Sequence, residues 1–225
     1  MLVAAVYKVL KNTAKAGNAI IGAGVYSAVL QSGEAWKEKV IKIGNNTDDP
    51  WLDYVELFQK SPLLQNNIHT PCVDRVYIDH QSEYYVANME QLDTHTDFEN
   101  DLKLELCDSI KNLVMGEETK EEFRETWAEY SEFFPSGMDH FFLLTDEIER
   151  QTDCFTFDDE EEWDGVDDYA RKLDLHAANI MLRNNCVVIT DPWCTLRVED
   201  NPSMEDYIDK SDDKDIEYQC QIWSN

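Results

Sequence analysis

Short runs of alternating apolar and polar residues dominate the chain as far as Leu92, and this alternation predicts strands. Between Asn18 and Val29 a pair of glycines interrupts the apolar positions, which indicates a strand, a glycine turn and a second strand. Polar stretches separate the later segments. We expect further strands over Glu38–Ile43, Val73–Asp79 and Tyr84–Met89.

Apolar residues at helical spacing predict helices on both sides of Leu92. Leu52, Val55 and Phe58 fall on one face of a helix expected over Trp51–Lys60, and Asp49-Pro50 precedes it as a helix start prefers. After Leu92 the helical period takes over. There we expect helices over about Phe98–Met115, Lys120–Phe134 and Met138–Gln151, and then a short buried strand over Cys186–Ile189.

This order, strands with one helix followed by helices and a short strand, is typical of the α+β class. We expect two lobes: an antiparallel-sheet lobe over residues 1–92 and a reduced helical lobe over residues 93–225. The length of 225 residues suits two small lobes with a cleft where they meet.

The composition favours a cytoplasmic protein without a membrane segment. No apolar run approaches the ~20 residues that a membrane-spanning helix needs. We expect Met1–Leu10 to form an amphipathic helix, since its apolar stretch is too short for a signal peptide. The six cysteines form no CxxC pair and have no histidines at metal-ligand spacing, so we expect free thiols and no zinc site.

The chain carries 47 acidic and 19 basic residues, for a net charge of −28. Such a surface repels phosphates, which argues against nucleic acid as a direct partner. Three interpretations remain open: a strongly solvated protein, attraction of basic protein partners, or imitation of the charge of DNA. The sequence leaves the oligomeric state undetermined.

The densest acidic block is an insert over residues 153–168. Asp158–Asp168 holds eight acidic residues in eleven positions and no basic residue. A block of this kind is usually a solvated loop, and the alternative is a docking surface for a basic substrate segment. The tail from Glu199 to Asn225 is acidic as well.

The glycine turn and the third strand carry candidate phosphate-binding groups. Gly22, Gly24 and Ser27 fit the pattern G-x-G-x-x-G, with serine at the third position, and such a hairpin can point its N–H groups at phosphates. Lys42 follows in the third strand, either as a surface lysine or as an ammonium that meets the α- and β-phosphates of ATP. Glu56 in the following helix is the preferred carboxylate partner for Lys42, and Asp53 is the alternative.

Residues 174–193 contain the most specific pattern in the chain. Asp174 is followed five residues later by Asn179, and Asp191 follows twelve residues after that, behind an apolar strand. Phosphoryl transfer from ATP needs one carboxylate near the attacking hydroxyl, and an amide and a second carboxylate that hold Mg²⁺. His176 is either a packing residue or a group that contacts the γ-phosphate or orients Asp174.

Taken together, these residues resemble the protein-kinase-like superfamily, from about Ala19 to Trp193. The resemblance implies a two-lobed protein-kinase-like fold with ATP and Mg²⁺ as cofactors. It implies that Asp174, Lys42 and His176 serve catalysis and that Asn179 and Asp191 bind metal. Nucleotide binding would fall to Gly22, Gly24, Ser27, Lys42 and Glu56, and to Glu90 and Leu92 in a hinge that comprises Met89, Glu90, Gln91 and Leu92.

Within this superfamily the chain is most similar to the early serine/threonine protein kinases of short-tailed lytic phages (autographiviruses). The segments that carry this resemblance are Val40–Gly44, Leu173–His176, Asn179–Met181 and Ile189–Pro192. It implies phosphorylation of serine and threonine in host bacterial proteins, to suppress host functions or defence. The setting would be the cytoplasm of the infected cell, and the acidic surface would suit substrates with basic segments.

The chain departs from the kinase pattern in several places. Lys172 and Leu173 stand where the family has His and Arg, so control by activation-loop phosphorylation is not expected. Pro192 and Trp193 replace Phe and Gly of D-F-G, which would stiffen that segment. Only 34 residues follow Asp191 (225 − 191), too few for the usual helical peptide platform.

Two alternatives to a protein kinase stay open. The order Asp-Leu-His-x-x-Asn also resembles aminoglycoside- and choline-kinase-like enzymes, which phosphorylate small molecules. A non-catalytic protein of this fold could instead act through its charge, as a decoy for DNA-binding or basic host proteins.

Overall fold

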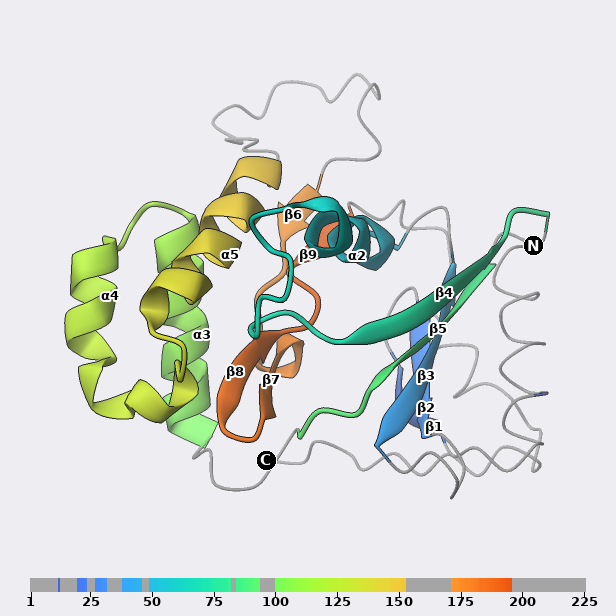
Figure 1. Ribbon diagram of the computed structural model, residues 1–225, viewed down its shortest axis with the longest axis horizontal. Coiled ribbons are helices and arrows are strands. Elements are labelled where there is room, and N and C mark those ends of the chain that lie inside the picture. Colours follow the sequence, from blue (N-terminus) through green and yellow to red (C-terminus); the bar gives the residue numbers. More distant parts are fainter. Residues whose placement is uncertain are drawn as a thin grey trace, which may run out of the picture. The chain divides into compact units, whose positions relative to one another are not determined.

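The computed structural model describes residues 12, 20–23, 27–31, 38–45, 49–81, 84–93, 100–152 and 171–195. These residues form antiparallel strands and several helices, which confirms the α+β class in this coarse form (Figure 1). The helix expected over Met1–Leu10, the acidic insert and the acidic tail lie outside the described residues.

The described residues group into two compact units. The first contains the described residues up to Asp49 together with Cys72–Gln91, and the second contains Pro50–Pro71 and the described residues from Leu92 onward. The sequence-based boundary after residue 92 kept Pro50–Pro71 with the sheet, whereas its contacts place it with the helices.

The first unit is built on an antiparallel five-stranded sheet in the order β1-β2-β3-β5-β4. The expected strands are confirmed, because every one of them has a counterpart in the sheet. The strands are β1 (Ile20–Ala23), β2 (Ser27–Gln31), β3 (Lys39–Asn45), β4 (Val73–Asp79) and β5 (Tyr84–Glu90).

A close contact between β3 and β5 explains one glycine of the sheet. Gly44 lies opposite Tyr85, and a Cβ at Gly44 would come within 2.6 Å of the tyrosine ring. The ring packs over the strand at this point, and its hydroxyl donates to Asp49 Oδ2 at 2.5 Å. Only a residue without a side chain fits beneath Tyr85.

Helix α2 (Trp51–Lys60) opens the second unit and has the predicted bounds. Trp51, Tyr54, Val55 and Phe58 are buried at spacings of three and four residues, so the helix has one apolar stripe. Ser61 adopts an extended conformation, and the Pro62 that follows disfavours a helical conformation there.

Three further helices, α3 (Asn100–Val114), α4 (Lys120–Thr126) and α5 (Met138–Gln151), pack together in the second unit (Figure 1). The expectation of a continuous helix over Lys120–Phe134 is wrong. α4 ends at Thr126, and a 3₁₀ segment η2 (Ala128–Phe133) follows, with Tyr130 at a non-helical φ of −108°. Phe133 and Phe134 are both buried at the end of this segment.

Aromatic side chains form the core between these helices. The Phe123 ring stacks on Phe141 at 5.6 Å and meets Phe134 and Phe142 edge-on at 5.9 and 5.8 Å. Phe141 in turn lies edge-on to His69 at 5.2 Å. Each fully buried ring of this size contributes on the order of 2–3 kcal/mol through burial.

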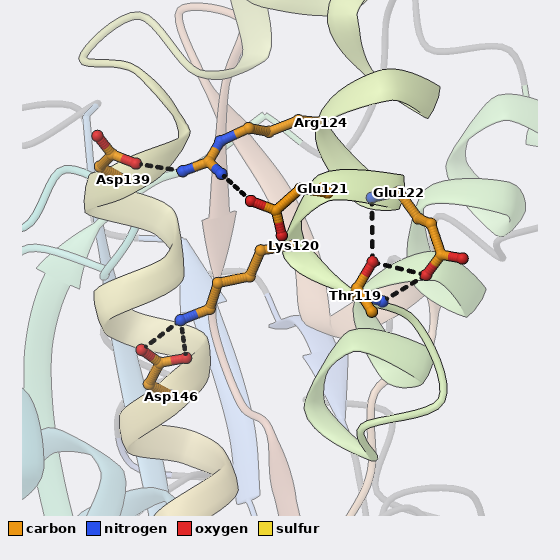
Figure 2. Close-up of polar contacts among 7 residues, drawn as sticks. All are labelled: Thr119, Lys120, Glu121, Glu122, Arg124, Asp139 and Asp146. Atoms are coloured by element: carbon orange, nitrogen blue, oxygen red, sulfur yellow. Dashed lines mark hydrogen bonds and ion pairs between the residues drawn. The ribbon is translucent and has the colours of Figure 1, made fainter.

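Polar contacts fix α4 against α5 at the surface (Figure 2). Lys120 pairs with Asp146 at 2.6 Å, and Arg124 pairs with Asp139 at 2.6 Å. Both cations also lie over the Phe142 ring, at 5.6 and 4.8 Å from its centroid. The pairs are exposed, so they set the register of the two helices more than the stability.

A capping box begins α4. The Thr119 hydroxyl accepts the Glu122 N–H at 3.2 Å, and the Glu122 carboxylate accepts the Thr119 N–H at 2.8 Å (Figure 2). The reciprocal bonds satisfy donors that the first helical turn leaves unpaired. None of the helices in the described part of the chain combines the length and apolar character needed to cross a membrane.

Two small antiparallel ribbons complete the second unit. One pairs β6 (Arg171–Leu173) with β9 (Trp193–Thr195), and the other pairs β7 (Ile180–Arg183) with β8 (Cys186–Ile189). The strand predicted over Cys186–Ile189 is confirmed, but it is one arm of a hairpin. Asn184 and Asn185, at φ 48° and 67°, form the tight turn, because asparagine tolerates the left-handed region.

Candidate functional site

The open end of the β7–β8 hairpin brings together two of the candidate metal ligands. Ile180 pairs with Ile189, so Asn179 and Thr190 are the next residues on the two arms. Thr190 donates to the Asn179 carbonyl oxygen through its N–H at 2.9 Å and its hydroxyl at 3.1 Å. Asp191 follows directly, so the hairpin holds Asn179 and Asp191 at the same end.

Asp174 is tied to both sides of this end. Its backbone N–H donates to the Pro192 carbonyl at 2.8 Å, and its own carbonyl accepts from the Asn179 amide nitrogen at 2.8 Å. In the β6–β9 ribbon Leu173 lies opposite Trp193, so this pairing also holds the chain before Asp174 close to the chain after Asp191. The second unit therefore gathers the backbone around Asp174, Asn179 and Asp191 at one place.

His176 begins the short 3₁₀ segment η3 (Ala177–Asn179), and its imidazole faces the same loop. Nδ1 accepts the Ala178 N–H at 3.2 Å. Nε2 lies 3.8 Å from Asp174 Oδ2 and 3.1 Å from the Asn179 amide nitrogen. The ring is exposed, and its Nε2 lies beside both the Asp174 carboxylate and the Asn179 amide.

The Asp191 segment is anchored by Trp193 and by two residues that the sequence did not single out, Tyr54 and Thr152. The Tyr54 hydroxyl, on α2, donates to the Ile189 carbonyl at 2.8 Å. The Trp193 ring meets Tyr54 edge-on at 5.7 Å, and its indole N–H donates to Thr152 at 3.0 Å. Tyr54 carried a sequence signal only as one apolar-stripe position of α2, which does not reveal the loop it contacts.

Lys42 lies at the centre of β3 in the first unit and is only 6% exposed. Lys42 is therefore not an exposed surface lysine, which was one of the two interpretations of the sequence. Its cross-strand partners are Val29 on β2 and Ala87 on β5, and Gly22 lies opposite Val29 in turn. Lys42 thus shares one face of the sheet with the side chains of Val29 and Ala87, and with Gly22, which has no side chain.

The candidate phosphate loop is described in part. Gly22 lies within β1, and a Cβ at Gly22 would meet nothing within 4 Å. Ser27 begins β2 opposite Gly44, while Gly24 lies outside the described residues. On either side of this loop β1 and β2 pair in antiparallel fashion, which is the strand–turn–strand arrangement that the sequence indicated.

The candidate hinge continues from β5. The Glu90 N–H donates to the Cys72 carbonyl at 3.0 Å, and its carboxylate accepts the Cys72 N–H at 2.6 Å. The Gln91 N–H donates to the Glu38 backbone carbonyl at 2.8 Å. The Glu90 and Gln91 N–H groups are therefore both engaged in backbone hydrogen bonds, and Leu92 is buried.

Glu56 lies on the exposed side of α2, in the second unit. Its carboxylate is 59% exposed and forms an ion pair with Lys60 one helical turn later. Asp53 is exposed on the same helix. The pairing expected between Glu56 and Lys42 stays a prediction.

Burial also shapes the protonation of groups behind the hairpin. His69 is fully buried, and its Nδ1 donates to the Val187 carbonyl at 2.7 Å. Burial lowers the pKa of His69 to about 4, because the apolar surroundings disfavour the cation. Burial, and then the negative charge of Asp191, raise the pKa of Tyr54 well above its ordinary range, so its hydroxyl remains a donor.

The donor chemistry at the hairpin end fits Mg²⁺. A hard cation takes carboxylate and amide oxygens, which Asp191 and Asn179 provide. The Asn179 side chain contacts Asp174 and His176 through its amide nitrogen, and its amide oxygen takes part in neither contact. Comparison with models of known protein families finds no match, and a search of curated proteins finds no significant match.

Proposed function

We propose that this protein is an ATP- and Mg²⁺-dependent phosphotransferase with a two-lobed protein-kinase-like fold. The observation that supports this most directly is the meeting of Asp174, Asn179 and Asp191 at the end of the β7–β8 hairpin. Phosphoryl transfer depends chiefly on positioning and on charge neutralisation, and these are the groups it requires. Lys42, a buried lysine on the central strand of the sheet, is the fourth group of the proposed mechanism.

The residues divide the work in a simple way. Asp174 orients the incoming hydroxyl and accepts its proton late in the transfer, and the His176 ring, whose Nε2 lies 3.8 Å from Oδ2, helps to position that carboxylate. Asn179 and Asp191 hold the metal, whose charge offsets that of the transferred phosphoryl group. Lys42 holds the α- and β-phosphates, and Gly22, Gly24 and Ser27 cover them.

The acceptors we propose are serine and threonine residues of host bacterial proteins, in the cytoplasm of an infected cell. The resemblance to phage early kinases and the net charge of −28 support this choice, since an acidic surface attracts basic protein segments. The test compares the phosphoproteomes of bacteria that express the wild type and Asp174→Ala. New phosphosites with the wild type alone are expected, and identical phosphosites would reject the proposal.

A small-molecule phosphotransferase is the second candidate, because of His176. The imidazole sits two residues beyond Asp174 and contacts both Asn179 and the Asp174 carboxylate, in the order shared with aminoglycoside- and choline-kinase-like enzymes. Transfer of labelled phosphate to purified host proteins, against transfer to a panel of cationic amines, separates the two candidates.

A further inference from the structure

The residues that surround Asp191 are anchored one after another. Ile189 donates its N–H to the His69 carbonyl at 3.0 Å and accepts from the Tyr54 hydroxyl at 2.8 Å. Thr190 is bonded to Asn179 through both its N–H and its hydroxyl. The chain on the amino-terminal side of Asp191 is therefore fixed at two consecutive residues.

The chain on the other side is fixed as well. The Pro192 carbonyl accepts the Asp174 N–H at 2.8 Å. Trp193 is 2% exposed, pairs with Leu173 and donates its indole N–H to Thr152 at the end of α5. The proline ring also fixes φ at residue 192, so little freedom remains on this side.

The Tyr54 side chain reaches both sides of Asp191. Its hydroxyl holds Ile189, and its ring packs edge-on against Trp193 with an interplanar angle of 84°. Tyr54 itself is fully buried and is braced by Phe58 at 5.2 Å. A rigid ring thus spans the Asp191 loop from the inner side of α2, within the same compact unit.

From this geometry we propose that Tyr54 is a positioning residue for Asp191, which holds the metal-binding carboxylate in a single orientation together with Trp193 and Thr152. The inference rests on the proposed function. It goes beyond that function by giving α2 a role that does not involve Glu56. In protein metal sites, groups that orient a ligand often change metal affinity when they are removed.

The decisive variant is Tyr54→Phe, which keeps the buried ring and removes only the hydroxyl. Binding of Mn²⁺ in the presence of a non-hydrolysable ATP analogue is measured by electron paramagnetic resonance, so that no transfer is needed. We expect Mn²⁺ affinity to fall about tenfold and the Mg²⁺ requirement for transfer to rise in parallel, with an unchanged KM for the acceptor.

Thr145→Val is the matched control. It removes another buried hydroxyl, which donates to the Phe142 carbonyl at 3.2 Å in the middle of α5. It should lower the unfolding temperature and leave Mn²⁺ affinity at the wild-type level. Thr152→Val is the second test variant, because it removes the acceptor for the Trp193 indole and should weaken Mn²⁺ binding in the same direction.

Three results would overturn the proposal. Folded Tyr54→Phe and Thr152→Val proteins with wild-type Mn²⁺ affinity would show that these side chains serve stability alone. Equal weakening in Thr145→Val would show a general effect of lost buried hydroxyls. A wild type that binds neither Mn²⁺ nor nucleotide would reject both this role and the proposed function, whereas binding without transfer to any acceptor would reject only the phosphotransferase.

Discussion

The side-chain amide of Asn179 donates a hydrogen bond to the backbone carbonyl of Asp174 at 2.8 Å. One residue proposed to bind metal thereby shapes the loop that presents the residue proposed to receive the proton. The same loop is closed from the opposite side by the bond from the Asp174 N–H to Pro192. The backbone around Asp174 is therefore fixed independently of its carboxylate, so this carboxylate can be changed without disturbing the loop.

Asp174→Asn should abolish transfer while the loop and nucleotide binding persist. The amide cannot accept the hydroxyl proton, and the backbone bonds of residue 174 are kept. We expect a loss of at least about 100-fold in the rate of phosphate incorporation, with nucleotide affinity close to that of the wild type. Asp146→Asn, on the surface of α5, is the control and should retain activity. Wild-type incorporation by Asp174→Asn would remove Asp174 from the mechanism.

Lys42→Met should separate stability from activity. Methionine is unbranched and of similar length, so it should fill the buried position of Lys42 and let the variant fold. Loss of the positive charge should lower transfer on the order of 100-fold. Lys39→Met on the same strand is the control, since Lys39 pairs with Asp74 at 2.9 Å and is partly exposed. Equal activity of the two variants would contradict a phosphate-binding role for Lys42.

Two glycines of the sheet should respond differently to alanine. Gly44→Ala would place a Cβ 2.6 Å from the Tyr85 ring, so we expect a loss of about 1–3 kcal/mol in the free energy of unfolding. Gly22→Ala meets open space and should leave stability nearly unchanged. It should instead raise the KM for ATP, because the new methyl group would stand where the phosphates are proposed to lie. Chemical denaturation and nucleotide titration measure the two effects, and equal destabilisation would refute the contrast.

The stability of the second unit should decline in mild acid through His69. The pKa of His69 is about 4 in the folded protein, against an ordinary value of 6.5, because burial disfavours the cation. The stabilising contribution of the neutral ring is therefore complete above pH 6.5 and is lost as the pH falls toward 4. We expect this one group to remove about 2 kcal/mol between pH 7 and pH 5.

Urea unfolding of the wild type and of His69→Gln at both pH values measures this effect. The variant lacks the titrating ring and starts less stable, because it loses the bond to Val187. The gap between the two proteins should narrow at pH 5. Parallel loss of stability in both would show that carboxylates, rather than His69, carry the pH dependence.

Regular periodicity made several elements predictable. Helices α2 and α5 and strands β4 and β8 have the bounds expected from their apolar positions. Such segments are long enough, or bounded clearly enough by turn residues, for local spacing to decide them. The break after α4 was missed, because the helical pattern continues through a segment in which tertiary packing of Phe133 and Phe134 overrides it.

The candidate site, too, was predictable from the sequence only in part. Asp174, Asn179 and Asp191 could be identified in order from the sequence, since their spacing and the apolar strand between them are local features. It gave no sign of the β6–β9 ribbon, whose strands of three residues are too short to show a period. Nor did it identify Tyr54 as a neighbour of the Asp191 loop.

By itself the sequence determined most of the longer helices and strands and the side chains that can carry the chemistry, because both follow from spacing over a few residues. Tertiary structure alone decided that Lys42 is buried, that α2 joins the helical unit and that Tyr54 and Trp193 enclose the Asp191 loop. The burial of Lys42 depends on the pairing of β3 with β2 and β5. The other two facts depend on contacts between residues more than a hundred positions apart, such as Tyr54 with Ile189. No local pattern specifies such contacts, because they arise only when apolar faces find each other in the folded chain.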